Sequence, residues 1–257
     1  MEEVIIKSYK EAYPNVYGFK TTCENPKSVI LFVHGMAEHI GRYKAIANYL
    51  SSKGFICYGF DLIGHGKSVF ENERVGVVKA DDFFTAEIEC IKHIYEFIKL
   101  ENKDLEINLF AHSMGSMISQ CYLEKYPEDF SKVILSGTDL GSFKYKIMSF
   151  LAKGMIKKHG LYYYSDLIQK LSLDSFDKPF KKKLGWLSVN EQNIKDYLEM
   201  KKVSGMPEWN PVSLRDLEDN FKDAGITALN SLNYHEQGGG DAKSLTIWSW
   251  IRGVAEL

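Results

Sequence analysis

Runs of apolar residues alternate with segments of helical periodicity along the first half of the chain. Four runs are almost continuously apolar, as is typical of strands buried on both faces of a parallel sheet: 28–33, 55–60, 107–111 and 133–135. Between the second and third runs, five apolar side chains recur at the spacing of one helix face: Phe84, Ile88, Ile91, Tyr95 and Ile98.

Weaker patterns complete this picture. Residues 4–9 and 15–21 are predicted to form short antiparallel edge strands. A helix is expected within 41–53, and another between Ser116 and Tyr126, while the pair Asp81-Asp82 offers a cap for the helix that follows it. Strand–helix alternation of this kind predicts the α/β class, with a mostly parallel sheet flanked by helices and right-handed crossovers.

The alternation stops near residue 140. Residues 140–202 contain no convincing strand, but two apolar-periodic segments lie around 143–157 and 161–172. We expect a helical cap inserted into an α/β core that comprises 1–139 and 203–257. Three apolar side chains of the cap are candidates for an acyl-chain pocket, although they would serve equally to pack the cap on the core: Phe143, Ile147 and Leu151.

After the cap, the strand signal is weak. A short remnant of a strand lies at 203–205, and residues 213–223 have a helical pattern. Ile226–Tyr234 is the predicted last strand, followed by a glycine-rich loop at 238–240 and a terminal amphipathic helix around 247–251.

Composition bounds the class of protein. The 257 residues suffice for one α/β domain with an insertion, and 45% hydrophobic with 26% charged residues is ordinary for a globular protein. A net charge of -2 argues against a nucleic-acid partner. No stretch reaches the ~20 apolar residues that span a bilayer. We therefore expect no stable membrane insertion, while transient contact with a lipid surface and the oligomeric state stay open.

The cysteines and the N-terminus predict a location. Met1–Val4 is acidic and lacks a signal-peptide pattern. The four cysteines have no paired spacing, and three of them fall inside apolar-periodic elements, which favours buried free thiols: Cys57, Cys90 and Cys121. We therefore predict a reducing, cytoplasmic setting. No cluster of His, Cys and Asp has ligand spacing, so we expect neither a metal nor another cofactor.

Ser113 is the candidate nucleophile. It lies between a strand-length apolar run and a helical pattern, with Ala111 two residues before it and Gly115 two residues after it. A serine on such a bend exposes its hydroxyl, and small flanking residues let the strand and the helix pass close to each other. We interpret the segment as a nucleophile elbow with alanine in place of the usual first glycine. The alternative role of this serine is that of a helix cap.

Two backbone N–H groups are candidate donors to the oxyanion of a tetrahedral intermediate. One belongs to Met114, directly after Ser113, and the other to Met36, in the turn after the strand at 28–33. Ligands of open parallel sheets bind beyond the carboxyl ends of the strands, so both turns are expected to face one crevice.

A serine hydroxyl also needs a base, usually a histidine that is held by a carboxylate. On a nucleophile elbow the triad follows the order serine, acid, histidine. Only His159 and His235 come after Ser113, and His159 falls in the cap, so His235 is the candidate base by elimination. The earlier histidines are interpreted as scaffold: His34, His65 and His112.

The acid should follow the strand that precedes the last one. Glu208 stands three residues after Gly205, and Asn210 lies just before a proline. Asp139, after the strand at 133–135, is a second source of a carboxylate. The candidate triad is therefore Ser113 with Glu208 and His235, with the acid position left open.

Three segments carry a resemblance to a known family: His34–Tyr43 (HGMAEHIGRY), Asp61–Ser68 (DLIGHGKS) and Ala111–Gly115 (AHSMG). Together they are similar to the monoacylglycerol lipase and lysophospholipase branch of the α/β-hydrolases, over roughly residues 25–200. The resemblance implies an α/β-hydrolase fold and hydrolysis of acyl esters such as monoacylglycerols or lysophospholipids through an acyl-enzyme on Ser113. It also implies oxyanion donors at Met36 and Met114.

The C-terminal part departs from that family. The family's acid lies in a Gly-x-x-Asp-Pro-Val-like turn; in the corresponding GMPEWNPV, counting from Gly205 favours Glu208 and counting back from Pro-Val favours Asn210. The family's histidine would fall near Gly240, beyond His235. We hypothesise that a deletion or a frame change has altered this end.

Two alternatives to a serine ester hydrolase therefore stay open. One is a catalytically impaired α/β-hydrolase that binds an acyl ligand without efficient turnover. The other is a peptidase-like member of the same fold.

Overall fold

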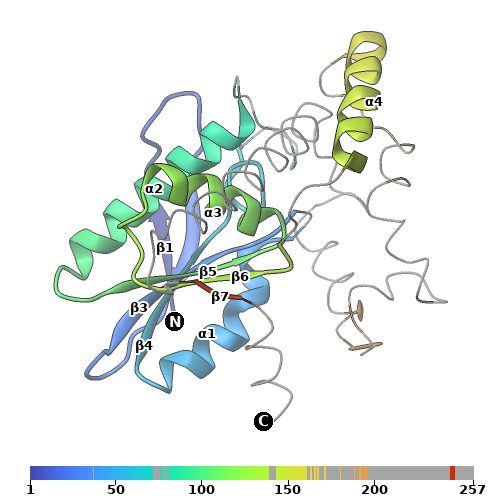
Figure 1. Cartoon of the computed structure of the whole chain (residues 1–257). Coiled ribbons are helices and arrows are strands. Elements are labelled where there is room, and N and C mark those ends of the chain that lie inside the picture. Colours follow the sequence, from blue (N-terminus) through green and yellow to red (C-terminus); the bar gives the residue numbers. More distant parts are fainter. Residues whose placement is uncertain are drawn as a thin grey trace.

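The computed structural model describes residues 1–36, 38–71, 82–138 and 143–160, the main chain of 244–246, and single residues among 76–80 and 163–195. Its described strands form one sheet in the order β1-β2-β4-β3-β5-β6-β7 (Figure 1). The strands are β1 (Glu2–Ile6), β2 (Val16–Lys20), β3 (Ser28–Val33), β4 (Phe55–Phe60), β5 (Ile107–His112), β6 (Val133–Ser136) and β7 (Ser244–Thr246). The helices are η1 (Ile40–Tyr43, 3-10), α1 (Lys44–Ser51), α2 (Phe83–Glu101), α3 (Met114–Lys125) and α4 (Phe143–His159).

Most of the sheet is parallel, which confirms the predicted class. Strands β4, β3, β5, β6 and β7 pair in parallel. Strand β1 pairs antiparallel with β2, and β2 pairs antiparallel with β4. The predicted antiparallel pair at the start of the chain is thus confirmed, with β1 at the edge of the sheet.

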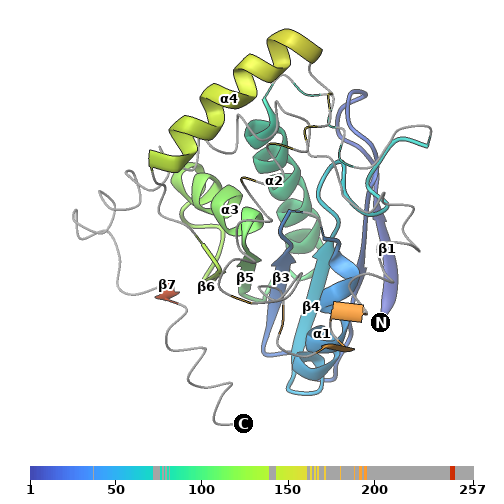
Figure 2. The ribbon, with the colours of Figure 1, turned by 90° about the vertical axis from the view of Figure 1, so that its right-hand side faces the viewer.

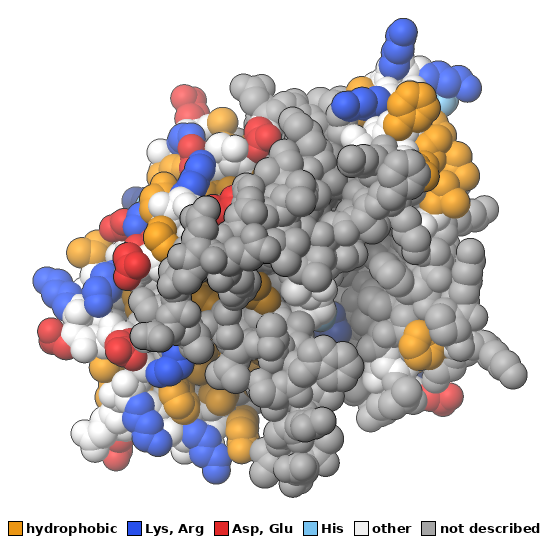
Figure 3. All heavy atoms as spheres, in the orientation of Figure 1, with side chains coloured by type: hydrophobic (Ala, Val, Ile, Leu, Met, Phe, Trp, Pro, Cys, Tyr) orange, Lys and Arg blue, Asp and Glu red, His pale blue; other side chains and the backbone are white. Residues whose placement is uncertain are grey.

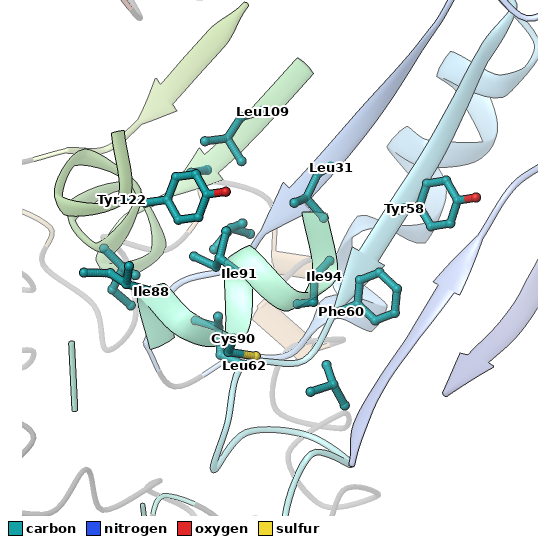
Figure 4. Packing of buried hydrophobic residues seen from close by; sticks show 14 of the residues in the cluster. Leu31, Tyr58, Phe60, Leu62, Ile88, Cys90, Ile91, Ile94, Leu109 and Tyr122 are labelled. Atoms are coloured by element: carbon teal, nitrogen blue, oxygen red, sulfur yellow. The ribbon is translucent and has the colours of Figure 1, made fainter. Parts of the chain in front are cut away.

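The sheet is buried on both faces, as its continuous apolar runs predict. Leu31 of β3 belongs to one cluster with Ile91 of α2 and Tyr122 of α3, and all three are at most 1% exposed (Figure 4). The next residue along β3, Phe32, points to the other face and joins a second cluster with Ala47 of α1. Successive side chains of a strand point to opposite faces, so the central strands need apolar residues at both positions.

The helix starts agree with the sequence or differ by a residue or two. The side chain of Asp82 caps α2 by accepting the Thr85 N–H at 2.6 Å, which confirms the cap predicted at the aspartate pair. Helix α3 begins at Met114 instead of Ser116, because the sharp bend at Ser113 lets the helix start at once.

The C-terminal quarter contributes the last described strand of the sheet. Strand β7 pairs in parallel with β6 and was not predicted, since the three residues Ser244–Thr246 are too short to carry an apolar pattern. The predicted helix at 213–223 and the predicted strand at 226–234 lie outside the described residues.

The strand order places two loops side by side. Strand β3 lies between β4 and β5, so the chain leaves β3 towards one neighbour and later returns to the other. This is a topological switch point, where the loops after the two central strands meet at the carboxyl ends of the strands. Helix α4 lies beyond this same end of the sheet (Figure 2). Among the described helices, none is both long and apolar enough to cross a membrane.

Candidate active site

Ser113 sits on a sharp bend between β5 and α3, as predicted. Its φ of 51° and ψ of -121° lie in a region that non-glycine residues rarely adopt. Main-chain hydrogen bonds hold the bend: the Ser113 N–H donates to the carbonyl of Ser136 at 2.7 Å, and the Ser116 N–H donates to the carbonyl of Ser113 at 2.9 Å. The strained conformation leaves the Ser113 side chain only half-buried.

Two glycines let the loop after β3 touch this bend. A Cβ at Gly115 would lie 2.3 Å from the carbonyl oxygen of His34, closer than real contacts allow. A Cβ at Gly35 would lie 2.9 Å from the Cβ of Ser113. Glycine is therefore required at both places by close approach, and the loop that carries Met36 runs directly against the candidate nucleophile.

Met114 is the first residue of α3, so its N–H has no partner within the helix. Within the described part of the chain, the N–H groups of Met36 and Met114 donate no hydrogen bond. The N-terminus of a helix also carries partial positive charge, which favours an anion beside it. The bend thus places the Ser113 hydroxyl beside a helix N-terminus, where an anion is favoured.

The loop after β3 is held by a buried carboxylate. Glu38 is 4% exposed, and its side chain accepts the Gly35 N–H at 2.5 Å and the Tyr43 hydroxyl at 2.9 Å, while Arg42 forms an ion pair with it. Burial raises the pKa of Glu38, but the neighbouring Arg42 and His34 outweigh it and hold the pKa below its usual value. The charged form therefore pins the backbone one residue before Met36.

His34 and His65 are buried scaffold residues, as interpreted from the sequence. The Nε2 of His34 accepts the Leu62 N–H at 2.9 Å, and its Nδ1 lies 2.8 Å from the carbonyl oxygen of Gly35. Both ring nitrogens of His34 are thus engaged. Burial lowers the pKa of His34 and of His65 to about 4, so both rings are neutral near pH 7.

Asp61 is a structural residue of the site that sequence reasoning did not single out. Its side chain accepts the N–H of Ile40 at 2.8 Å and of Lys67 at 2.9 Å, and so ties the loop after β4 to the loop after β3. Gly66, at φ +50°, packs so close that a Cβ there would lie 2.1 Å from a carboxylate oxygen of Asp61. The signal was present in the DLIGHGKS segment, where an aspartate ends a strand and glycines follow it.

The roles of the other predicted site residues stay predictions. Ile147 is 48% exposed and Leu151 is half-buried, while only the main chain of Phe143 is described, so their role in binding an acyl chain stays a prediction. The candidates for acid and base lie outside the described residues: Glu208, Asn210, Asp139 and His235.

No base is placed at Ser113 by the described residues. Among them, no histidine ring or carboxylate is hydrogen-bonded to the Ser113 hydroxyl. His112 instead directs its Nδ1 to the Ser136 hydroxyl at 3.2 Å, and His159 stacks on Tyr163 with ring centroids 4.1 Å apart. The described residues also include no group of three or more His, Cys, Asp or Glu that could hold a metal ion.

Known proteins are similar in sequence to the part of the chain that carries this site. The family model described as serine aminopeptidase, S33 matches residues 24–213. A monoacylglycerol lipase of Mycolicibacterium smegmatis is 31% identical over 122 residues, which are 48% of this chain and 41% of that protein. A monoglyceride lipase of Mus musculus is 34% identical over 110 residues, which are 43% of this chain and 34% of that protein. These matches thus span less than half of the relatives' length.

Solved structures agree on the fold. A thermostable carboxyl esterase from Bacillus coagulans superposes with a TM-score of 0.78 at 19% identity, over 95% of this chain and 89% of that one. At this identity the likeness establishes the architecture, which is the α/β-hydrolase fold.

The close approach at Gly115 predicts a first outcome. We expect Gly115→Ala to lower the free energy of unfolding by about 1–3 kcal/mol, because the added methyl group meets the His34 carbonyl. Gly154→Ala is the matched control, since no described residue lies within 4 Å of a Cβ at that helical position; alanine there should cause no loss. Urea unfolding measures both, and equal losses in the two variants would contradict the close contact.

The buried carboxylate predicts a second outcome. Glu38→Ala should lower the free energy of unfolding by about 3 kcal/mol, because it leaves the Arg42 charge and the Gly35 N–H without their partner. The control is Glu89→Ala, which removes a surface ion pair with Lys10 and should cost less than about 1 kcal/mol. Thermal or urea unfolding of the two variants measures both losses. A Glu38→Ala protein as stable as the Glu89→Ala protein would contradict the stabilising role of the buried carboxylate.

The neutral histidines predict a pH dependence. The pKa of His34 and of His65 is about 4 in the folded chain against an ordinary 6.5, so the unfolded state binds protons that the folded state does not. The contribution of the two neutral rings to the free energy of unfolding is therefore complete above about pH 6.5 and falls as the pH drops towards 4. We expect the free energy of unfolding to be about 2–4 kcal/mol lower at pH 5 than at pH 7, although the raised pKa of Asp61 acts in the opposite sense.

Urea unfolding between pH 7 and pH 5 measures this slope. His65→Asn should weaken it, whereas His159→Gln, at an exposed ring, should leave it unchanged. A flat profile, or an equal effect of both substitutions, would rule out buried neutral histidines as the cause.

Proposed function

Because the chain belongs to the serine aminopeptidase S33 family of α/β-hydrolases, we propose that it is a serine carboxylester hydrolase. Its substrates are acyl esters such as monoacylglycerols or lysophospholipids, and the acyl-enzyme forms on Ser113. The observation that carries this proposal is the position of Ser113 on the strained bend before α3, with the Gly35 loop in contact with it.

In this mechanism the Ser113 hydroxyl attacks the ester carbonyl carbon. The carbonyl oxygen takes up the negative charge and accepts hydrogen bonds from the N–H groups of Met36 and Met114. The hydrogen bond from the Gly35 N–H to the Glu38 carboxylate supports the role of Met36, because it fixes the adjacent peptide. The base that removes the Ser113 proton returns it to the leaving oxygen as the intermediate collapses and expels the alcohol, and the same base then activates the water that hydrolyses the acyl-enzyme.

We propose His235 as the base on its order in the chain, and Glu208 as the acid on its order and its distance from Gly205. Residues 140–202 are proposed as a cap over the site. The choice of esters over peptides is supported by the relatives, which are named as a monoacylglycerol lipase and a monoglyceride lipase.

A cytoplasmic location is part of the proposal. Cys57 and Cys90 are buried free thiols, as predicted, whereas Cys121 is half-buried. Burial raises the pKa of the Cys57 thiol to about 12 and also raises that of Cys90, so both stay unreactive. Such thiols are usual in proteins of a reducing compartment.

A fluorophosphonate probe tests the nucleophile, because covalent capture needs an activated serine. We expect the wild-type chain to be labelled and Ser113→Ala not to be. Ser119→Ala is the matched control in the helix that follows Ser113, since its buried hydroxyl has no hydrogen-bond partner among the described residues, and it should be labelled like the wild type. Labelling that survives in Ser113→Ala would refute the assignment, and an unlabelled wild type would favour an impaired acyl-binding protein.

Hydrolysis of p-nitrophenyl esters of increasing chain length tests the substrate class. We expect longer acyl chains to be preferred, and His235→Ala to lower kcat by about 10³-fold or more. His159→Gln should change neither kcat nor the preference for longer acyl chains. Cleavage of aminoacyl amides in preference to these esters would favour the peptidase-like alternative, and full activity of His235→Ala would remove His235 as the base.

A further inference from the structure

Strand β1 forms one edge of the sheet, and β2 is its only partner among the described strands (Figure 2). In the register of these two strands, Ile5 lies opposite Tyr17. The main chain of Tyr17 bonds away from β1, because its carbonyl accepts the Asp61 N–H at 2.8 Å and its N–H donates to the Ser68 hydroxyl at 2.9 Å. Ile5 and Tyr17 therefore share no hydrogen bond, and the N–H and C=O of Ile5 face the open edge.

The neighbouring main-chain groups follow the same alternation. Those of Glu3 face the open edge as well, because the direction of hydrogen bonding alternates along a strand. No described residue is hydrogen-bonded to the main chain of Glu3 or Ile5 on this side. At Lys7, the next residue in the alternation, the carbonyl oxygen lies 3.0 Å from Nε2 of His93. A row of unpaired donors and acceptors of this kind is a template for a further strand.

The side chains along this edge form a charge pattern. Glu3, Ile5 and Lys7 lie on one face, because successive side chains of a strand alternate between its faces. All three are exposed, Ile5 to 53%. Glu3 forms an exposed ion pair with Lys67, whereas Lys7 has no ion pair with a described residue. An acidic, an apolar and a basic side chain thus follow one another at equal spacing along the open edge.

We propose that the open edge of β1 pairs antiparallel with β1 of a second copy of this chain, in the register that sets Ile5 opposite Ile5. In this register Glu3 of each copy lies opposite Lys7 of the other, so two cross-strand pairs of opposite charge form. The two exposed isoleucines cover each other and exchange both of their main-chain hydrogen bonds. The sheets of the two copies thereby join into one.

The charges select this register over the others. A slip of one residue sets the outward-facing groups of one copy opposite residues that already bond to β2, so no ladder forms. A slip of two residues sets Glu3 or Lys7 opposite Ile5, which gains no ion pair. A slip of four residues sets Glu3 opposite Glu3, or Lys7 opposite Lys7, and like charges directly opposite are destabilising. Charges at an edge commonly prevent pairing, and here one alignment makes them complementary.

Charge and size set the strength of the association. The chain has a net charge of only -2, and acidic and basic side chains are mixed over the described part of the surface in Figure 3, so long-range repulsion between copies is small. Pairing of two strands of five residues buries less than the ~1,200 Å² of a stable interface. The dimer is therefore weak and reversible. Because both copies use the same edge, the pairing closes at two copies.

Sedimentation velocity of the full chain over a series of concentrations tests the association. We expect a monomer at low concentration, a dimer at high concentration and a shift back towards the monomer as salt is added. A wild type that stays monomeric up to about 1 mM, or that assembles beyond the dimer, would overturn the proposal. The result does not depend on the proposed function.

Exchange of the two charges tests the register. Glu3→Lys and Lys7→Glu should each raise the Kd of the homodimer by about tenfold or more, because like charges then lie opposite each other in both pairs. A mixture of these two variants should form a heterodimer, in which every pair is again of opposite charge. The double variant Glu3→Lys/Lys7→Glu should dimerise like the wild type.

The matched controls reverse exposed charges outside β1: Glu24→Lys and Lys103→Glu. Both controls should dimerise like the wild type. A loss of equal size in the controls, or a mixture and a double variant that stay monomeric, would overturn the assignment to β1.

A proline tests the main-chain hydrogen bonds. Ile5→Pro removes the N–H that faces the open edge but none that bonds to β2, and proline is tolerated at such an edge position. We expect it to abolish the dimer, whereas Ile5→Thr, which keeps the N–H, should weaken the dimer less. Thermal unfolding of both variants checks that they fold. A folded Ile5→Pro protein that dimerises like the wild type would show that the copies associate elsewhere and would overturn the proposal.

Discussion

The contact between the loop after β3 and the bend after β5 is the constraint on which the site depends. Two segments that are distant in the chain approach so closely that only glycine fits at positions 35 and 115. The approach is made possible by the sheet, in which β3 and β5 are neighbours and run parallel. The strained Ser113 backbone is thus held by the whole sheet rather than by local hydrogen bonds alone.

Close backbone contact creates a second requirement, because polar groups become buried with it. The N–H of Gly35, the N–H of Leu62 and the N–H of Ile40 each need an acceptor away from water. Three buried side chains supply them: Glu38, His34 and Asp61. A charged carboxylate is costly to bury, and here Arg42 compensates Glu38 while main-chain donors compensate Asp61. The motif residues that look catalytic in the sequence are therefore mostly the framework of the loops.

The sequence predicted this region well for a physical reason. Strands buried on both faces need uninterrupted apolar runs, so β3 and β4 could be located to the residue, and β5 to within one residue, from hydrophobicity alone. Ser113 could be located because a strand-to-helix bend needs small neighbours. Asp61 was not singled out, since its role depends on which backbone N–H groups the fold brings near it. Strand β7 was missed because three residues carry no periodic signal, and the main-chain groups of β1 that face the open edge could be identified only from the register of the sheet.

The two halves of the proposed chemistry differ in what supports them. The proposed nucleophile and oxyanion donors are supported by the contact of two described loops, whereas the proposed base rests on the order of histidines in the chain. This difference has a kinetic consequence. An elbow with its oxyanion donors but without a working base still accelerates the reaction by about 10³-fold over water in serine-protease precedent. A complete triad raises the rate by several further powers of ten. The size of the rate enhancement, compared between the wild type and its serine and histidine variants, therefore reports directly on whether the C-terminal half of the chain completes the site that the N-terminal half has built.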